Sequence, residues 1–350
     1  MKHFLIRVSL VAVSIGLCVS SSTAGRQNVQ VNAVQERVYS NWTLLQSNRP
    51  PTPTVDSPLL RETSCGKKTT SLMTHLTGRI AGGSVATPNE YPWMVYLQIY
   101  TSKFSAYYYV CGGTLISNQW ILTSANCLEG AQSINVYLGA HDINSQNEWQ
   151  RIMYTTTVYI QHPNWNSQTN TADDIALIKL PVAINYNAYI KSICLPSFDD
   201  PSHEGDTVFL TGWGRTSGYD INGPLSPTLR ETTSTVISNA ECSAVYGGSI
   251  ITANTICSSG TGGKGICPSD NGGPMSYMTT DGNFVQIGVA SFYSSTGCEN
   301  GHPSGFTRIQ NYLDWISTET GVITPNSASA MGNSICYKLV IVLVLAIHYF

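Results

Sequence analysis

Ten cysteines constrain the fold of this 350-residue chain more than any other feature. Cys18 lies in an apolar segment at the start of the chain, and Cys336 lies just before an apolar segment at its end. If both ends are processed away, eight cysteines remain, an even number that suits a disulfide framework. Disulfides persist in secreted proteins and are rare in the cytosol. The count therefore favours a secreted, disulfide-linked domain, and many pairings remain open.

The first 24 residues predict a signal peptide. Lys2 and Arg7 give a basic start, residues 8–19 form an apolar core, and residues 22–24 supply small side chains for cleavage. The alternative is a short buried helix. We expect residues 1–24 to direct the chain into the secretory pathway.

Residues 322–350 form a tail that predicts glycolipid (GPI) attachment. Asn326, the candidate attachment residue, starts a run of small residues, and a mostly polar stretch leads to the apolar residues 339–350. Those twelve apolar residues are fewer than the ~20 that a membrane-spanning helix needs. A tail that simply stays or is trimmed, and a marginal membrane span, are the alternatives.

Residues 25–79 predict a pro-segment or linker. Their first forty residues are polar and contain the proline-rich residues 50–53, a composition typical of extended, weakly ordered chain. Asn41 begins the triplet Asn-Trp-Thr, a glycosylation site in a secreted protein.

The charge of the chain excludes several classes of partner. Only 11% of the residues are charged, against about a quarter in an average domain. Residues 80–325 carry 8 Lys+Arg and 18 Asp+Glu, so their net charge is 8 − 18 = −10. So acidic a domain is a poor binder of nucleic acid or of anionic membranes. A basic protein partner is possible, and a solvated acidic surface is the simpler interpretation.

The residues from 80 onward predict an all-β domain. Residues 91–99, 134–138 and 207–210 alternate in the manner of strands, and Gly, Asn and Ser turns separate many short apolar runs. Such a series is typical of sandwiches and barrels. Residues 309–318 place apolar side chains at helical spacing, which predicts one C-terminal helix.

Six short motifs in fixed order resemble the trypsin/chymotrypsin-like serine proteases (peptidase S1 type). They occupy residues 79–83, 111–116, 123–127, 174–177, 212–214 and 267–274. The resemblance covers residues 80–321 and implies two six-stranded β-barrels with a C-terminal helix. In that family the active cleft lies between the barrels.

The resemblance places the catalytic triad at Asn126, Asp174 and Asn271, so two of its three groups have changed. A serine attacks a carbonyl only when a base takes its proton, and imidazole suits that task because its pKa lies near neutral pH. A carboxamide is neither such a base nor such a nucleophile. His141 and His162 match loop and strand-end positions, and we interpret them as structural.

The substrate-binding positions implied by the resemblance also depart from the family pattern. Ser269 replaces a glycine whose amide helps to form the oxyanion hole, and glycine adopts positive φ more easily than other residues. No acid stands in the pocket to bind a basic side chain, and a tyrosine at its mouth is expected to narrow it. The pocket positions are Gly265, Ile266, Ser291, Tyr293 and Ser304.

The resemblance further implies a disulfide pattern and an activation switch. It pairs Cys111 with Cys127, Cys242 with Cys257, Cys267 with Cys298, and Cys65 with Cys194. A fifth family bridge is absent, because its positions are Val208 and Tyr277. Cleavage between Arg79 and Ile80 would release an amino terminus that pairs with Asp270.

Together these features predict an inactive serine protease homologue, not an enzyme. We expect it to bind extracellular proteins, such as proteases or their inhibitors, as a decoy, cofactor or competitor. The alternatives are a serine endopeptidase with weak residual activity and a relic without a selected function. We expect a monomer on the outer face of the plasma membrane, with no cofactor. We also expect no metal, because Ala140 replaces the acidic residue of calcium-binding trypsins.

Overall fold

The computed structural model describes residues 65–69, 83–102, 107–168, 172–216 and 223–322. All of them belong to one compact unit, residues 62–328. The predicted signal peptide, Asn41, the Arg79–Ile80 bond and the tail with Asn326 lie outside the described residues. Within the described ranges, no helix has the length and apolar character needed to cross a membrane.

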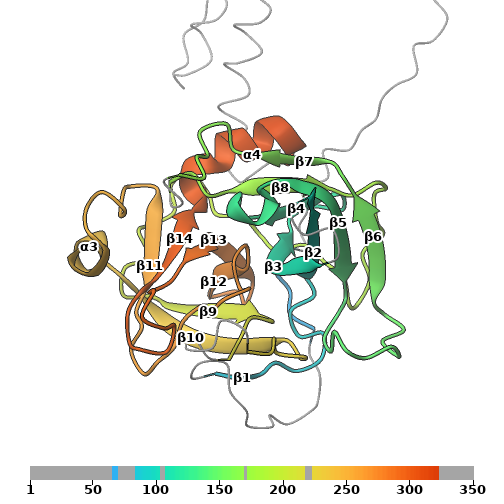
Figure 1. Ribbon diagram of the computed structural model, residues 1–350, viewed down its shortest axis with the longest axis horizontal. Helices are drawn as coiled ribbons and strands as arrows, with labels where there is room; N and C mark the ends of the chain where they lie inside the picture. Colours follow the sequence, from blue (N-terminus) through green and yellow to red (C-terminus); the bar gives the residue numbers. More distant parts are fainter. Residues whose placement is uncertain (1–64, 70–82, 103–106, 169–171, 217–222, 323–350) are drawn as a thin grey trace, which may run out of the picture. The chain divides into compact units, whose positions relative to one another are not determined.

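Seven strands form the N-terminal sheet, drawn in teal and green in Figure 1. They are β2 (Met94–Thr101), β3 (Tyr108–Leu115), β4 (Trp120–Thr123), β5 (Ala131–Leu138), β6 (Ile152–Thr156), β7 (Tyr159–Gln161) and β8 (Ala176–Lys179). All neighbours are antiparallel, in the order β6-β5-β2-β3-β4-β8-β7. The Lys179 amide of β8 donates to the Val158 carbonyl, which continues the β7–β8 pairing. The Thr156 hydroxyl at the end of β6 donates to the Lys179 carbonyl at 2.9 Å, so the sheet curls and brings the end of β6 close to β8.

The C-terminal sheet closes into a barrel of six strands, β9 to β14, drawn in yellow to red in Figure 1. Closure follows because β10 pairs with β9 on one side and with β11 on the other. The strands are β1 (Ser84–Val85), which adds to β10, then β9 (Thr207–Gly212), β10 (Arg230–Ile237), β11 (Thr255–Ser258), β12 (Pro274–Met278), β13 (Phe284–Phe292) and β14 (Ser304–Arg308). The all-β prediction is confirmed.

Two α-helices and two 3-10 turns complete the described fold. Helix α3 (Asn239–Tyr246) begins at a capping box, in which the Ser238 hydroxyl accepts from the Glu241 amide and the Glu241 carboxylate accepts from the Ser238 amide. The turn η4 (Ile309–Tyr312) runs into α4 (Leu313–Thr320), which ends at a left-handed glycine. The C-terminal helix was predicted and is confirmed.

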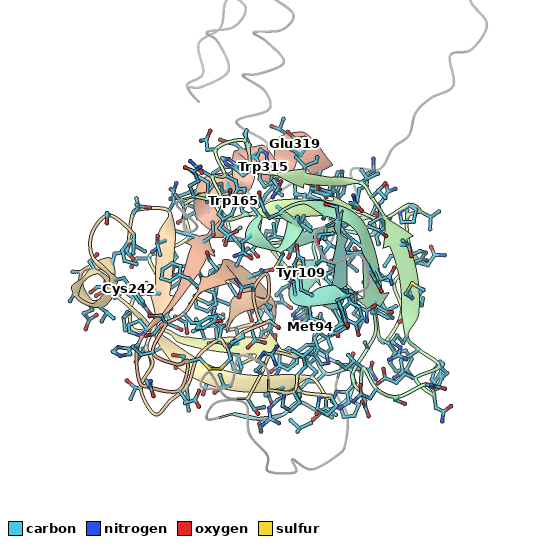
Figure 2. The ribbon with its side chains drawn as sticks, viewed as in Figure 1. Met94, Tyr109, Trp165, Cys242, Trp315 and Glu319 are labelled. Carbon is cyan, nitrogen blue, oxygen red and sulfur yellow. A yellow bond between two sulfur atoms is a disulfide. The ribbon has the colours of Figure 1, made fainter. Side chains whose placement is uncertain are left out.

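Helix α4 follows the C-terminal barrel yet packs against the N-terminal one, beside β7 (Figure 1). The His162 ring, just after β7, meets the rings of Tyr312 and Trp315 edge-on at 5.1 and 5.0 Å (Figure 2 labels Trp315). One buried cluster contains residues of both barrels and of α4, among them Trp93 and Phe284. This shared core fixes the two barrels relative to each other and so positions the residues between them.

The four disulfides join the pairs that the resemblance implied: Cys65–Cys194, Cys111–Cys127, Cys242–Cys257 and Cys267–Cys298. Losing a native disulfide from a small secreted domain costs about 2–5 kcal/mol. The first bridge closes a loop of 129 residues and anchors residues 65–69. The backbone there also pairs with the body, because Phe284 donates to the Gly66 carbonyl and Gly66 donates to that of Ser192.

Candidate active site of a serine protease fold

Three loops and one strand bring the triad positions together between the barrels. Asn126 opens the 3-10 turn η3 (Asn126–Leu128) immediately after β4, and Asp174 precedes β8. Asn271 lies in the turn before β12, and Ser291 lies near the end of β13. Residues more than a hundred positions apart therefore converge at the junction of the two sheets.

Asp174 is the centre of this group and is fully buried. Its Oδ1 accepts the Asn126 backbone N–H at 2.7 Å. Its Oδ2 accepts the Asn126 side-chain amide and the Ser291 hydroxyl, both at 2.6 Å. Asn126 thus occupies the place beside the aspartate that an imidazole would take. Its amide group donates a hydrogen bond there, but a carboxamide does not accept a proton as a general base would.

Burial raises the pKa of Asp174 from 3.8 to about 6. The hydrogen bonds from Ser291 and Asn126 act in the opposite direction, because each stabilises the charged form. The carboxyl is therefore ionised at neutral pH and protonated in mild acid. No imidazolium is present beside it to use that charge.

Asn271 occupies the nucleophile position and is held by its own side chain. Its Nδ2 donates to the Ser291 carbonyl at 2.8 Å, and the Asn126 Nδ2 reaches the same oxygen at 3.4 Å. Both carboxamides therefore donate to one backbone acceptor of β13. Gly272 follows with φ of +82°, and a Cβ there would overlap Thr123 and the Gly112 carbonyl. This close approach keeps the turn in the shape that the nucleophile position requires.

The oxyanion-hole turn keeps a glycine-like backbone although its residue is serine. Ser269 has φ of +76°, in the left-handed region that favours glycine. A non-glycine residue there costs about 1–2 kcal/mol. Among the described residues, no acceptor takes the backbone N–H of Ser269 or of Asn271. The turn thus keeps its backbone shape, with the strain of a side chain added.

Asp270 is buried behind this turn and is satisfied by the main chain. Its Oδ1 accepts the Gly214 amide at 2.7 Å, and its Oδ2 accepts the Cys267 amide at 3.0 Å. A Cβ at Gly212 or Gly214 would overlap the carboxylate, so both positions require glycine. Burial raises the pKa of Asp270 to about 6, while these amides and the nearby Arg230 charge act to lower it.

The specificity-pocket positions lie on two walls that face each other. A Cβ on Gly265 would lie 2.6 Å from the Ser304 hydroxyl, and that hydroxyl accepts the Ile266 amide at 3.1 Å. Ile266 and Ser304 are both buried. Tyr293 packs against the cluster that contains Ile266 and against the Cys267–Cys298 disulfide.

A cleft of about 410 Å³ borders the oxyanion-hole turn at Ser269. Ser269 lines one end of it, and a run of three tyrosines supplies most of the aromatic surface. The lining residues are Tyr107, Tyr108, Tyr109, Val110, Arg215, Leu225 and Ser269. Figure 2 labels Tyr109, which lies on β3. Sequence reasoning missed these residues, although three adjacent tyrosines before Cys111 were a visible signal.

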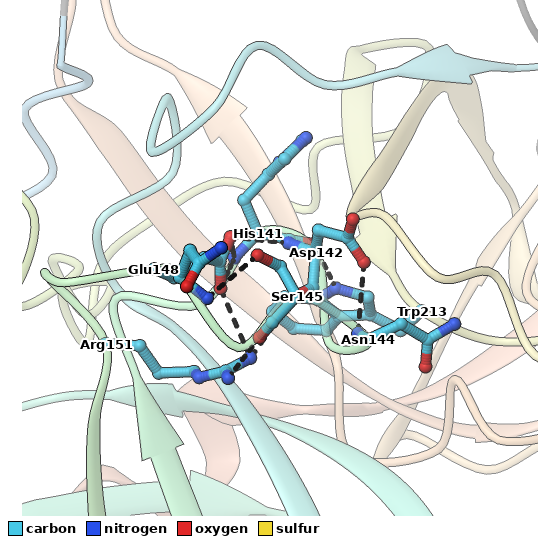
Figure 3. Close-up of polar contacts among 8 residues, drawn as sticks. His141, Asp142, Asn144, Ser145, Glu148, Arg151 and Trp213 are labelled. Carbon is cyan, nitrogen blue, oxygen red and sulfur yellow. Dashed lines mark hydrogen bonds and ion pairs between the residues drawn. The ribbon is translucent and has the colours of Figure 1, made fainter.

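The loop after Gly139 is held by side chains (Figure 3). The Glu148 carboxylate accepts the backbone amides of His141 and Asp142 at 2.7–3.2 Å, and Arg151 pairs with Glu148 at 3.4 Å. The Trp213 indole donates to the His141 carbonyl at 2.9 Å. Desolvation lowers the pKa of the buried His141. This histidine is a structural part of the loop and lies outside the triad.

Within the described ranges, one group of three metal-ligating residues comes close together: Cys267, Cys298 and Glu299. The two cysteines form a disulfide, so they offer no thiolate to a metal ion. This group carries no metal site.

Barrels, cleft and triad positions together define the fold of a chymotrypsin-like serine protease. Residues 80–316 match the Trypsin family model, and this chain belongs to the trypsin family. Brachyurin of Leptuca pugilator is 42% identical over 246 residues, which are 70% of this chain and 100% of the relative. Chymotrypsin-like elastase family member 1 of Bos taurus is 34% identical over 242 residues, 68% of this chain and 88% of that protein.

Solved structures agree with this assignment. The structure of HL collagenase aligns with a TM-score of 0.61 at 35% identity, covering 70% of this chain and all of that one. The family and its fold, both expected from the motifs, are confirmed.

Proposed function

We propose that this chain is a secreted protease homologue that acts by binding and not by catalysis. The observation that carries the proposal is the use of the two carboxamides: Asn126 donates to Asp174, and Asn271 donates to the Ser291 carbonyl. Neither side chain can accept a proton at neutral pH or attack an amide. Loss of triad members lowers turnover by up to roughly 10⁶-fold.

The preserved surroundings support a retained binding role. Asp270 keeps its amide partners, the oxyanion-hole turn keeps its backbone shape, and the cleft beside Ser269 remains open. An extended polypeptide segment fits such an aromatic, weakly charged cleft, since tyrosine provides large rigid contact area at low entropy cost. We expect proteases or protease inhibitors of the extracellular space as partners.

A serine-directed fluorophosphonate probe tests the loss of catalysis. The chain cleaved after Arg79 should not be labelled and should not hydrolyse peptides. The matched positive control is the Asn126→His/Asn271→Ser double variant, which should be labelled because the small probe needs no specificity pocket. Labelling or peptide turnover by the unaltered chain at rates near those of the double variant would overturn the proposal.

The pocket is tested in the same background. Because Tyr293 packs over the disulfide at the pocket, the double variant should turn peptides over slowly. Adding Tyr293→Gly should raise kcat/KM at least 10-fold, while the rate of probe labelling changes little. Ordinary protease activity in the double variant alone would show that Tyr293 does not close the pocket.

We also propose that the mature chain is attached to the cell surface by a GPI anchor. The order of small, polar and apolar residues in the tail supports this. Phosphatidylinositol-specific phospholipase C should release the protein from cells that express the full chain, and an Asn326→Leu variant should be lost from the surface. Surface protein that resists the phospholipase would contradict the anchor and leave the binding role unaffected.

A further inference from the structure

A loop before β9 surrounds one buried histidine with acidic side chains. Residues 199–206 contain four acidic residues, and His203 lies among them with only 5% of its surface exposed. His203 has φ of +62°, a left-handed conformation that costs a non-glycine residue about 1–2 kcal/mol. Its ring lies tilted against that of Tyr277 on β12, with 4.3 Å between centroids. The loop thus fixes the imidazole against Tyr277 and keeps the His203 backbone in a strained conformation.

The hydrogen bond at one ring nitrogen sets the state of the other. His203 Nδ1 lies 3.0 Å from Asp206 Oδ2. A carboxylate only accepts, so Nδ1 carries the hydrogen. A carboxylate on the far nitrogen is the usual outer partner of a metal-bound histidine, because it fixes the tautomer and increases the basicity of the ligand nitrogen.

The second ring nitrogen, Nε2, is buried and has no hydrogen-bond partner among the described residues. It faces Asp200 Oδ2 at 3.8 Å. That separation exceeds the 2.7–3.2 Å of an N–H···O hydrogen bond. Two metal–ligand bonds of about 2.0–2.2 Å each would span it. A lone pair opposite a carboxylate oxygen is repulsive unless a positive charge lies between them.

Although the sequence led us to expect no metal, we propose that a divalent transition-metal ion of the zinc class binds between His203 Nε2 and Asp200 Oδ2. Imidazole nitrogen with carboxylate oxygen suits zinc, copper or nickel, whereas calcium and magnesium prefer oxygen ligands alone. Water completes the coordination. The site is distinct from the cleft and from the triad positions, so the inference does not depend on the proposed binding function.

Two neighbours orient the Asp200 ligand. The Ser197 hydroxyl donates to Asp200 Oδ1 at 2.8 Å, which leaves Oδ2 directed to the site. The Tyr277 hydroxyl lies 3.5 Å from Oδ2. Its O–H is directed to this oxygen as a donor.

The position of the site gives the metal a structural role. Tyr277 and Val208 stand where the family resemblance expects the missing fifth disulfide. A metal ion on His203 and Asp200 would rigidify the loop that packs on Tyr277. Because it would bind the folded chain and not the unfolded one, it stabilises the fold by mass action.

Zinc binding to the secreted chain, purified without a polyhistidine tag and freed of metal, tests the proposal. Calorimetry should detect one ion per chain, and zinc should raise the Tm. His203→Asn should abolish both effects, since asparagine tolerates the left-handed backbone. Asp206→Asn should weaken binding by about 10–100-fold. The matched control is His302→Gln, an exposed histidine, which should bind zinc normally.

Two results would overturn the site. One is zinc binding that persists unchanged in His203→Asn or, should that variant misfold, in Asp200→Asn. The other is a metal-free chain whose His203 shows both ring nitrogens protonated by NMR at pH 7.5 and no response to zinc, since a proton would then supply the positive charge. Cobalt substitution should give visible absorption bands in the unaltered chain that Asp200→Asn loses.

Discussion

Asp174 and Asp270 are two buried carboxylates near the nucleophile position, and they differ in the groups that donate hydrogen bonds to them. Two side chains, the Asn126 amide and the Ser291 hydroxyl, donate to Asp174 beside one backbone amide, that of Asn126. The main chain surrounds Asp270: the amides of Gly214 and Cys267. Burial raises the pKa of both to about 6.

The difference explains which region has changed. A side-chain partner can be replaced by a substitution that keeps a hydrogen-bond donor, and Asn126 is such a replacement. A backbone partner cannot be replaced, because its position depends on the turn and on glycines at 212 and 214. The side chains at two of the triad positions have therefore changed, while Asp270 keeps its backbone partners.

The largest effect should follow removal of the backbone-satisfied carboxylate. Asp270→Ala leaves two buried N–H groups without acceptors and should lower the free energy of unfolding by about 3–5 kcal/mol. Asp270→Asn should cost less, because its amide oxygen still satisfies one of them. Urea denaturation measures both, with the exposed Asp281→Ala as control. An Asp270→Ala variant within 1 kcal/mol of wild type would show that the turn does not depend on this carboxylate.

The pH dependence should separate buried from exposed carboxylates. A folded-state pKa near 6, above the 3.8 of the unfolded chain, means that the folded state holds the proton more tightly. The contribution of the protonated Asp174 carboxyl to the free energy of unfolding is thus complete below pH 3.8, and it is lost as the pH rises through 6. At 1.36 kcal/mol per pKa unit, the loss is about 3 kcal/mol for Asp174. Between pH 4 and 6.5, wild type should lose about 2 kcal/mol more stability than Asp174→Asn. Equal slopes would contradict the raised pKa.

A double-mutant cycle should show that the Asn126 side chain is coupled to Asp174. Asp174→Ala and Asn126→Ala should each be destabilising, and their effects should be non-additive by about 1–2 kcal/mol, because the second change removes a partner that is already lost. Asp270 and Asn126 are not joined by a hydrogen bond. The effects of Asp270→Ala and Asn126→Ala on the free energy of unfolding should therefore be additive within about 0.5 kcal/mol. Thermal and urea unfolding of the single and double variants provide the cycle.

The smallest effect should come from relieving the strained turn. Ser269→Gly removes a side chain from a left-handed position, worth about 1–2 kcal/mol, and adds chain entropy that costs about 0.5–1 kcal/mol. A net stabilisation of about 0.5 kcal/mol is expected. Ser234→Gly, in the unbroken register of β10 with β9, should instead destabilise. A destabilising Ser269→Gly would show that the serine side chain contributes contacts which outweigh the strain.

Much of the fold could be predicted because local sequence patterns indicate its strands and its C-terminal helix. Alternation at residues 91–99 and 207–210 became β2 and β9, and the helical spacing after residue 309 became η4 and α4. The disulfide pairs followed from the family resemblance and not from the spacing of the cysteines. How the C-terminal barrel closes was not visible locally, since the β9–β10 pairing joins residues that are from 230 − 212 = 18 to 235 − 207 = 28 positions apart.

The sequence predicted which residue types stand at the candidate site, and the tertiary structure decided which of them contact one another. With Asn126 and Asn271, neither a histidine base nor a serine nucleophile stands at these triad positions, because the residue type alone determines the chemical group of a side chain. Only the tertiary structure decides that both amides donate to the Ser291 carbonyl and that Arg230 acts on Asp270. Those contacts arise where two sheets meet.

His203 shows the same division. The sequence determined that one histidine lies among four acids, an arrangement without a recognised motif. Barrel packing placed the ring against Tyr277 of β12, and the turn of the loop itself placed Nδ1 beside Asp206 and Nε2 opposite Asp200, each three residues away. Local sequence specifies which groups exist, and burial between distant strands specifies which of them must find a partner, because only there is water absent.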